Sequence, residues 1–320
     1  MKLFKTADNP IPPNPSVGQV RTVDGYNLRY ARWRTLQPPA KGTVIILHGR
    51  TEFVEKYHET VTDLRKSGFE VLTFDWRGQG GSDRFFKRRQ RGHVDSFDQY
   101  VIDLDTILEN VALPDCRGPL YVLAHSTGGL VALLAAPLLT NRVERIVLTS
   151  PLIGFGEFGL PPRWLRLVTG FLSAIGLGGV YMSHTKDPDS LPDFPSNRVT
   201  SDTRRFTRNT EFLAEHPELA IGGPTAGWIF AAAQAMDRIH EPDFIASIAV
   251  PTLLISAGND SIVSNRAIED YGRRMRVGRT VRIDGAKHET LQERDVYREQ
   301  VLAAFNAFVP GTSPIDRIDG

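Results

Sequence analysis

The stretch from Tyr121 to Leu130 constrains the fold more than any other part of the chain. It begins with an apolar, β-prone run and continues, after Ser126, into small residues and an alanine-rich segment. This order predicts a strand, a sharp turn at Ser126 and a helix. A serine on such a turn lifts its hydroxyl clear of the sheet, beside the unpaired N–H groups that open the helix.

Ser126 is therefore a candidate nucleophile. The strained turn and the close passage of the helix require small residues two positions to either side, which Ala124 and Gly128 provide. Ala124 stands where glycine is usual, so its methyl group is the one departure. The motif alone is weak, because a buried strand followed by a serine-capped core helix has the same pattern.

Strand and helix patterns alternate along most of the chain. Residues 19–23 and 28–34 predict an antiparallel hairpin at the edge of a sheet. Buried strands are predicted at Thr43–Leu47, 69–74, 121–125, 143–149, 251–256 and 280–283, and helices at 57–66, 98–111, directly after Ser126, 264–275 and 294–308. This alternation predicts an α/β fold with a mostly parallel, doubly wound sheet, whose ligands bind at the carboxyl ends of the strands.

One insertion interrupts the alternation. Residues 151–246 carry helical patterns at 164–177, 202–215 and 224–239, joined by proline- and glycine-rich loops. We interpret them as a helical cap over the site. The expected organisation is a proline-rich tail at 1–17, an α/β core at 18–150 and 247–309, the cap at 151–246 and a C-terminal tail at 310–320.

Composition excludes several classes of function. A formal net charge of +1, with 23% charged residues, gives no footprint for nucleic acid, and the single cysteine, Cys116, allows no intrachain disulfide. The N-terminus lacks the apolar core of a signal peptide, so a cytoplasmic location is expected. The apolar stretch 167–183 is glycine-rich and short for a membrane span, which favours a core or cap helix. We expect no metal and no cofactor.

A serine nucleophile needs a base and an acid on later loops. His288 follows the last predicted strand, and Asp260 follows the strand before it, which gives the chain order Ser, Asp, His. Asp284 is the alternative acid, but it shares a loop with His288 and is typical of a turn cap. The oxyanion of an acyl-transfer intermediate would be bound by the backbone N–H groups of Thr127 and Arg50.

At this point the chain resembles the α/β-hydrolases of the lysophospholipase and monoacylglycerol lipase group, often called serine aminopeptidase S33. The resemblance covers nearly the whole chain. The cap segment 209–226 is further similar to the bacterial lysophospholipase L2 branch. The matching motifs are His48-Gly49-x-x-Glu52, Arg77-Gly78-Gln79-Gly80-x-Ser82, Arg91-Gly92-His93-Val94, the Ser126 turn, Asp260 and His288.

The resemblance implies a serine hydrolase that cleaves carboxylic esters of single-chain acyl lipids through an acyl-enzyme. Its substrate would be a small acyl ester or lipid, such as a lysophospholipid or a monoacylglycerol. The alternatives are an S33-type aminopeptidase, an esterase of small esters and a non-catalytic hydrolase-like binding protein. Acyl-chain length, headgroup and oligomeric state are not readable from the sequence.

Two surfaces carry hypotheses about lipid. Trp164 and Phe171 belong to an apolar stripe at helical spacing, which packs on the core or lines a channel for the acyl chain towards Ser126. The loop 84–91, from Arg84 to Arg91, holds five cations and two phenylalanines. It is either a solvated basic loop or a peripheral contact with anionic membrane.

Overall fold

The computed structural model describes residues 2–85, 91–157, 161–182 and 193–309. These residues contain one eight-stranded sheet in the order β1-β2-β4-β3-β5-β6-β7-β8. The strands are β1 (Ser16–Arg21), β2 (Asn27–Trp33), β3 (Thr43–Leu47), β4 (Glu70–Phe74), β5 (Leu120–His125), β6 (Arg145–Thr149), β7 (Thr252–Ala257) and β8 (Gly278–Ile283). The β1–β2 and β2–β4 pairs are antiparallel and all later pairs are parallel, which confirms the predicted fold class.

The helices lie close to their predicted ranges. They are α1 (His58–Lys66), α2 (Asp98–Ile107), α3 (Leu113–Asp115), α4 (Thr127–Leu134), α5 (Ala136–Leu139), α6 (Pro162–Ala174), α7 (Thr203–Glu215), α8 (Ala226–His240), α9 (Pro242–Ser247), α10 (Asn265–Arg274) and α11 (Asp295–Phe308). α1 ends at Lys66, as predicted, shortly before Gly68, whose φ of 99° is the left-handed conformation that glycine adopts without strain.

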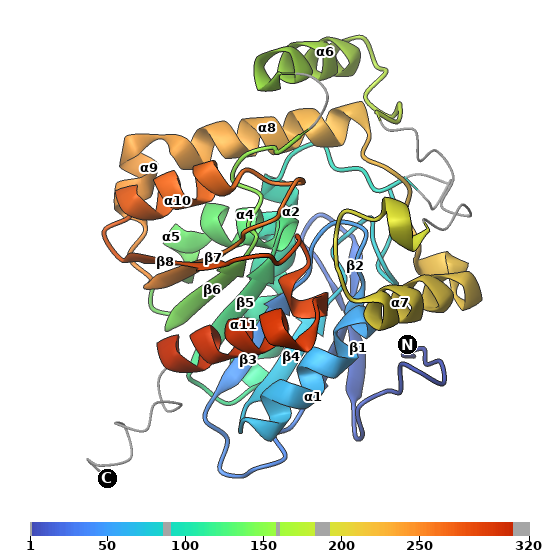
Figure 1. The fold of residues 1–320 in the computed structure, drawn as a ribbon, viewed down its shortest axis with the longest axis vertical. Coiled ribbons are helices and arrows are strands. Elements are labelled where there is room, and N and C mark those ends of the chain that lie inside the picture. The colour runs from blue at the N-terminus through green and yellow to red at the C-terminus, as the bar shows by residue number, and fades with distance from the viewer. Residues whose placement is uncertain (1, 86–90, 158–160, 183–192, 310–320) are drawn as a thin grey trace.

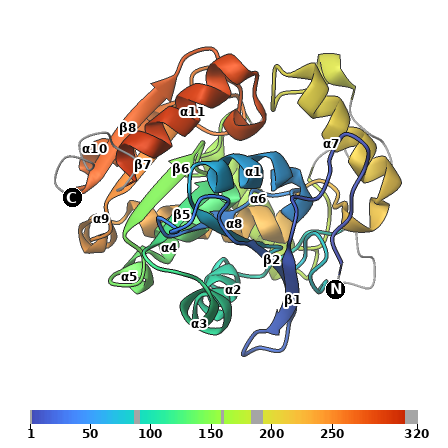
Figure 2. The same ribbon diagram turned by 90° about the horizontal axis from the view of Figure 1, so that it is seen from below.

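Helices cover both faces of the sheet (Figures 1 and 2). On one face α1 and α11 pack through Leu64 and Phe305, and on the other α2, α4 and α10 pack through Leu104, Leu130 and Ile268. Strands β3, β4, β5 and β7 consist entirely of buried residues. Burial on both faces explains why these strands read as continuous apolar runs.

The strand order reverses direction at β3, which lies between β4 and β5. The loops that leave the carboxyl ends of β3 and β5 therefore diverge to opposite faces and leave a crevice between them. His48 and Gly49 follow β3, and Ser126 follows β5. The fold thus brings the first loop motif and the candidate nucleophile to the same place.

Helices α6, α7 and α8 occupy the chain between β6 and β7. α8 contacts both α4 and α6, and α6 lies farthest from the sheet, at the top of Figure 1. Among the described residues no helix is long and apolar enough to cross a membrane. Residues 86–90 of the predicted basic loop, Ser183 of the apolar stretch and the tail 310–320 lie outside the described residues.

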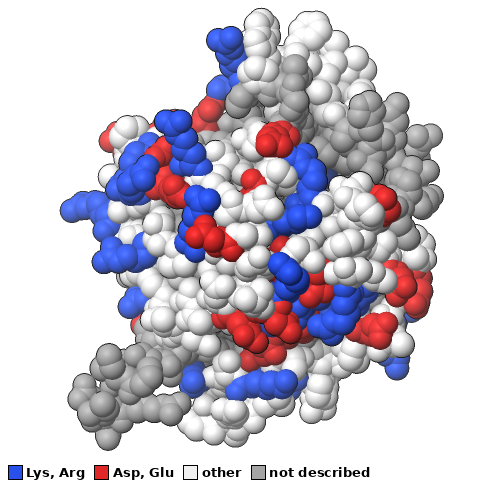
Figure 3. Space-filling model, in the orientation of Figure 1, with Lys and Arg blue, Asp and Glu red and all other residues white. Residues whose placement is uncertain are grey.

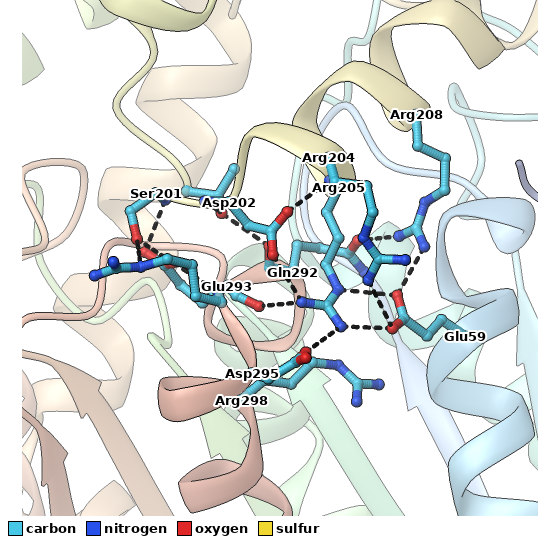
Figure 4. A network of polar contacts seen from close by, with 12 residues as sticks. Glu59, Ser201, Asp202, Arg204, Arg205, Arg208, Gln292, Glu293, Asp295 and Arg298 are labelled. Carbon is cyan, nitrogen blue, oxygen red and sulfur yellow. Dashed lines mark hydrogen bonds and ion pairs between the residues drawn. The ribbon is translucent and has the colours of Figure 1, made fainter.

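Positive and negative side chains interleave on the face shown in Figure 3. One group of these charged side chains links α7 to α1 and α11 (Figure 4). Arg205, whose side chain is only 2% exposed, donates to Glu59 of α1 (2.6 Å), to Asp295 of α11 (2.7 Å) and to Asp202, the N-cap of α7 (2.9 Å). Because such a buried guanidinium is costly unless every partner is in place, Arg205 ties the position of α7 to α1 and α11.

We expect the substitution Arg205→Leu to lower the free energy of unfolding by at least about 2 kcal/mol, because it leaves carboxylates without their cation. The neighbouring Arg204→Leu is the matched control. The Arg204 side chain is 72% exposed and reaches Glu59 only at 4.0 Å, so its loss should cost no more than about 0.5 kcal/mol. Urea denaturation measures both values, and equal losses would contradict the role given to Arg205.

Candidate active site

Ser126 lies between β5 and α4 in a strained conformation, with φ 50° and ψ −113°. Its N–H donates to the carbonyl of Thr149 (3.0 Å), and its own carbonyl accepts from Leu152 N (3.0 Å). A positive φ is uncommon for a residue other than glycine, and such strain gathers at functional sites. These bonds hold the predicted sharp turn and aim the Ser126 side chain away from the sheet.

The small residues around Ser126 have different reasons to be small. A Cβ on Gly128 would lie 2.3 Å from the carbonyl oxygen of Leu47, so only glycine lets α4 pass β3 at this distance. Ala124 sits within β5 in ordinary strand pairing with Leu47 and Leu148. Its methyl group is fully buried and requires no unusual backbone there. The departure at Ala124 therefore leaves the turn intact.

Three side chains from separate loops meet at Ser126. The Nε2 atom of His288 lies 3.0 Å from the Ser126 hydroxyl, and its Nδ1 atom lies 2.7 Å from Oδ2 of Asp260. The other oxygen of Asp260 accepts from the backbone N–H groups of Ile262 (2.8 Å) and Val263 (3.1 Å). Asp260 is thus oriented by its own loop and can fix the tautomer and the ring orientation of His288.

The alternative acid, Asp284, points elsewhere. Its side chain is 86% exposed and accepts from Nε of Arg282 (2.8 Å). Burial acts to raise the pKa of Asp260, but the hydrogen bond and charge of His288 outweigh burial and hold this pKa below its ordinary value. Asp260 is therefore a carboxylate at neutral pH, as a partner of an imidazolium must be.

The loop after β3 lies against the Ser126 turn. A Cβ on Gly49 would come within 3.1 Å of the His125 ring, and Gly49 N donates to Glu52 Oε2 at 2.5 Å. The carbonyl of His48 accepts from the indole of Trp76 (2.9 Å). These contacts fix the backbone that leads to Arg50. Thr127, the other expected donor, is the first residue of α4, where the N–H has no acceptor within the helix.

A buried ion network, which the sequence did not reveal, joins this loop to the loop of His288. Lys56 Nζ lies 2.9 Å from Glu52 and 2.7 Å from Glu289, the residue after His288. Burial raises the pKa of Glu289, and Lys56 opposes that rise. The spacing of Glu52 and Lys56 by four residues was a local signal for one pair. The partner Glu289, 233 residues further on, could be found only from the fold.

The His125 ring lies beside the His288 ring in a tilted arrangement, with 4.9 Å between the ring centroids. Burial lowers the pKa of His125 to about 4. His125 is therefore neutral at neutral pH and places no positive charge beside His288, where a cation would oppose protonation of the imidazole.

The two predicted cap residues lie on the outer side of α6. Trp164 is 51% exposed and Phe171 is 65% exposed, whereas Leu165 and Thr169 of the same helix are buried. At the basic loop, Arg84 donates to the carbonyls of Gly80 (2.7 Å) and Glu218 (3.2 Å). Contact of Trp164 and Phe171 with an acyl chain, and of the loop with anionic membrane, remain predictions.

Among the described residues, no group of three or more His, Cys, Asp or Glu side chains is arranged to hold a metal ion. The assembled groups instead have the arrangement that acyl transfer requires: a hydroxyl, a base, an acid that orients the base, and a helix N-terminus beside the hydroxyl.

Comparisons with known proteins show which family the chain belongs to. Lysophospholipase L2 of Escherichia coli K12 is 32% identical over 294 residues, which cover 89% of this chain and 85% of that protein. Phospholipase YtpA of Bacillus subtilis is 26% identical and covers 86% of this chain and 97% of that protein. A solved monoglyceride lipase from Saccharomyces cerevisiae superposes with a TM-score of 0.73 at 19% identity, over 94% of this chain and 98% of that one.

A family model described as serine aminopeptidase, S33, matches residues 38–295, which include the sheet from β3 to β8, the inserted helices and all three side chains at Ser126. The chain therefore belongs to this S33 family of α/β-hydrolases, among lipases and esterases related to lysophospholipase L2.

Proposed function

We propose that the protein is a serine hydrolase that cleaves carboxylic esters of single-chain acyl lipids. The single observation that carries the proposal is the chain of hydrogen bonds from Ser126 through His288 to Asp260. The names of the relatives, lysophospholipase L2 and phospholipase, support a lipid ester as substrate.

In this mechanism the Ser126 oxygen attacks the ester carbonyl while Nε2 of His288 takes the hydroxyl proton. Asp260 stabilises the imidazolium, and the N–H groups of Arg50 and Thr127 bind the oxyanion. Collapse of the intermediate breaks the bond to the alcohol, which receives the proton from His288. Water then attacks the acyl-enzyme by the same route and releases the fatty acid.

An aminopeptidase of this family is the second candidate. It would need an acidic side chain near the site to hold the free amine of its substrate. Glu211, Glu215 and Glu218 of the inserted region are all exposed, and Asp187 and Asp189 lie outside the described residues. Arg50, a cation beside the candidate oxyanion hole, would repel an ammonium group. These observations favour an ester substrate.

Replacement of the three side chains tests the mechanism. Ser126→Ala and His288→Ala should each lower kcat by at least about 10³-fold, and Asp260→Asn by a similar factor, because these changes remove the nucleophile, the base and the carboxylate that stabilises the imidazolium. Asp284→Asn is the matched control and should stay within roughly twofold. A fluorophosphonate probe should label Ser126 in the native protein. A larger loss for Asp284→Asn than for Asp260→Asn would mean that the acid is Asp284.

Lys56 tests whether the buried ion network positions His288. Lys56→Met leaves the carboxylates of Glu52 and Glu289 facing each other, which should raise the pKa of Glu289 further. We expect kcat/KM to fall at least about tenfold and the acid limb of its pH profile to move to higher pH. Lys56→Arg should restore much of the activity, and the exposed Lys66→Met should change little. An unchanged pH profile would refute the network's role.

The dependence of kcat/KM on acyl-chain length tests whether the substrate is a lipid ester. If the exposed apolar face of α6 contacts the acyl chain, each methylene buried contributes about 0.8 kcal/mol, or up to roughly fourfold in specificity. On monomeric p-nitrophenyl esters, kcat/KM should therefore rise through the short and medium chains. Polar substitutions at Trp164 or Phe171 should flatten this rise and spare acetate hydrolysis. If kcat/KM is highest for the acetate ester, the lipid substrate is wrong and the small-ester and peptidase alternatives are favoured.

A further inference from the structure

The side chain of Arg50 reaches from the loop after β3 into the junction between the core and the inserted helices. Its Nη2 atom donates to the carbonyls of Gly222 (2.9 Å) and Gly223 (2.7 Å), just before α8. The guanidinium carbon lies 5.2 Å from the centre of the Trp228 ring on α8. The same residue therefore offers its backbone N–H to the candidate oxyanion hole and a cation a few ångströms further on.

This cation has no anionic partner among the described residues. Arg50 is half-buried, whereas Arg29, Arg77 and Arg205 are buried and each of these three pairs with at least two carboxylates. Arg50 has only backbone carbonyls and an aromatic face. Its Nε atom is fully buried without an acceptor, and its Nη1 atom has no acceptor either but is not enclosed. Nη1 is thus available to a ligand.

A buried charge without a counter-charge is unfavourable, and proteins normally pair it. Burial lowers the pKa of Arg50 to about 10, so the guanidinium still carries its charge at neutral pH. The carbonyls and the Trp228 ring stabilise this charge but do not neutralise it. An anion bound at Nη1 would complete the site.

We propose that the Arg50 guanidinium binds the phosphate of a lysophospholipid substrate. This inference rests on the proposed function and narrows its substrate class to phosphate-bearing single-chain esters. In a lysophospholipid the short glycerol backbone keeps the phosphate close to the ester. One arginine could therefore bind the ester oxyanion through its backbone N–H and the phosphate through its guanidinium. Guanidinium N–H groups match phosphate oxygens in geometry and charge.

The alternative role for Arg50 is mechanical, because its carbonyl contacts also join the loop after β3 to the segment before α8. A purely mechanical role predicts that substitution impairs every ester to the same degree. A phosphate-binding role predicts a loss that depends on the headgroup. The ratio of two substrates with the same acyl chain separates these roles.

The experiment compares a lysophosphatidylcholine and a monoacylglycerol with the same medium-length acyl chain, both below their critical micelle concentrations. For Arg50→Gln, the ratio of kcat/KM for the phosphate ester to that for the neutral ester should fall at least roughly tenfold. Arg50→Lys should recover part of the ratio, because it keeps the charge. Arg238→Gln is the matched control, since Arg238 of α8 is exposed and already paired with Asp98. An equal loss on both esters would overturn the proposal.

Equilibrium binding separates this inference from the proposed function. In the Ser126→Ala protein, the fluorescence of Trp228, which lies against Arg50, should report the phosphate lipid, and its dissociation constant should rise at least roughly tenfold on Arg50→Gln. If the native protein cleaves neither lipid but this dependence holds, the proposed function fails and only the binding of phosphate by Arg50 stands. If both lipids are cleaved and the dissociation constant does not change on Arg50→Gln, the inference is wrong and the proposed function is unaffected.

Discussion

The strained backbone of Ser126 is the constraint on which the rest of the site depends. A non-glycine residue at φ 50° costs of order 1–3 kcal/mol and persists only where its surroundings over-determine it. Hydrogen bonds to Thr149 and Leu152, on the β6 side, and the contact of Gly128 with β3 supply that determination. The orientation of one hydroxyl is therefore a property of the central three strands of the sheet.

The position of His288 depends as strongly on the inserted region. The N–H of Glu289 donates to the carbonyl of Val199 (2.8 Å), and Lys287 Nζ donates to the carbonyl of Asn197 (3.0 Å). Both acceptors lie just before α7, which Arg205 fastens to α1 and α11. Residues between β6 and β7 therefore support the histidine loop directly. A displacement of α7 would therefore shift the loop that carries His288.

The sequence predicted those features that local chemistry determines. Continuous apolar runs located the parallel strands, and the places of Ser126, Asp260 and His288 after three strands predicted that these side chains meet. The helical periodicity predicted an apolar stripe on α6. It did not predict which side chains of the stripe would stay exposed to solvent, because their exposure depends on how α6 packs on α8.

Contacts between segments that are distant in the chain could not be predicted from the sequence for a related reason. Lys56 lies beside Glu289 only because the helical turn before α1 and the loop after β8 meet at one edge of the site. Arg50 was selected for its backbone N–H, and nothing in its neighbourhood along the chain indicated that its guanidinium would meet carbonyls rather than carboxylates. Burial of a charge and the identity of its partners are tertiary properties.

The buried charges around the loop after β3 differ in sign on its two sides. Next to His288, Lys56 is shared by Glu52 and Glu289, so the group carries an excess of negative charge when both carboxylates are ionised. Next to α8, Arg50 is a cation without a carboxylate. The proposed reaction creates an imidazolium at His288 and an oxyanion at the N–H of Arg50. With both carboxylates ionised, a negative group beside His288 and a positive group beside the oxyanion position favour this separation of charge before any substrate binds, which is electrostatic preorganisation for acyl transfer.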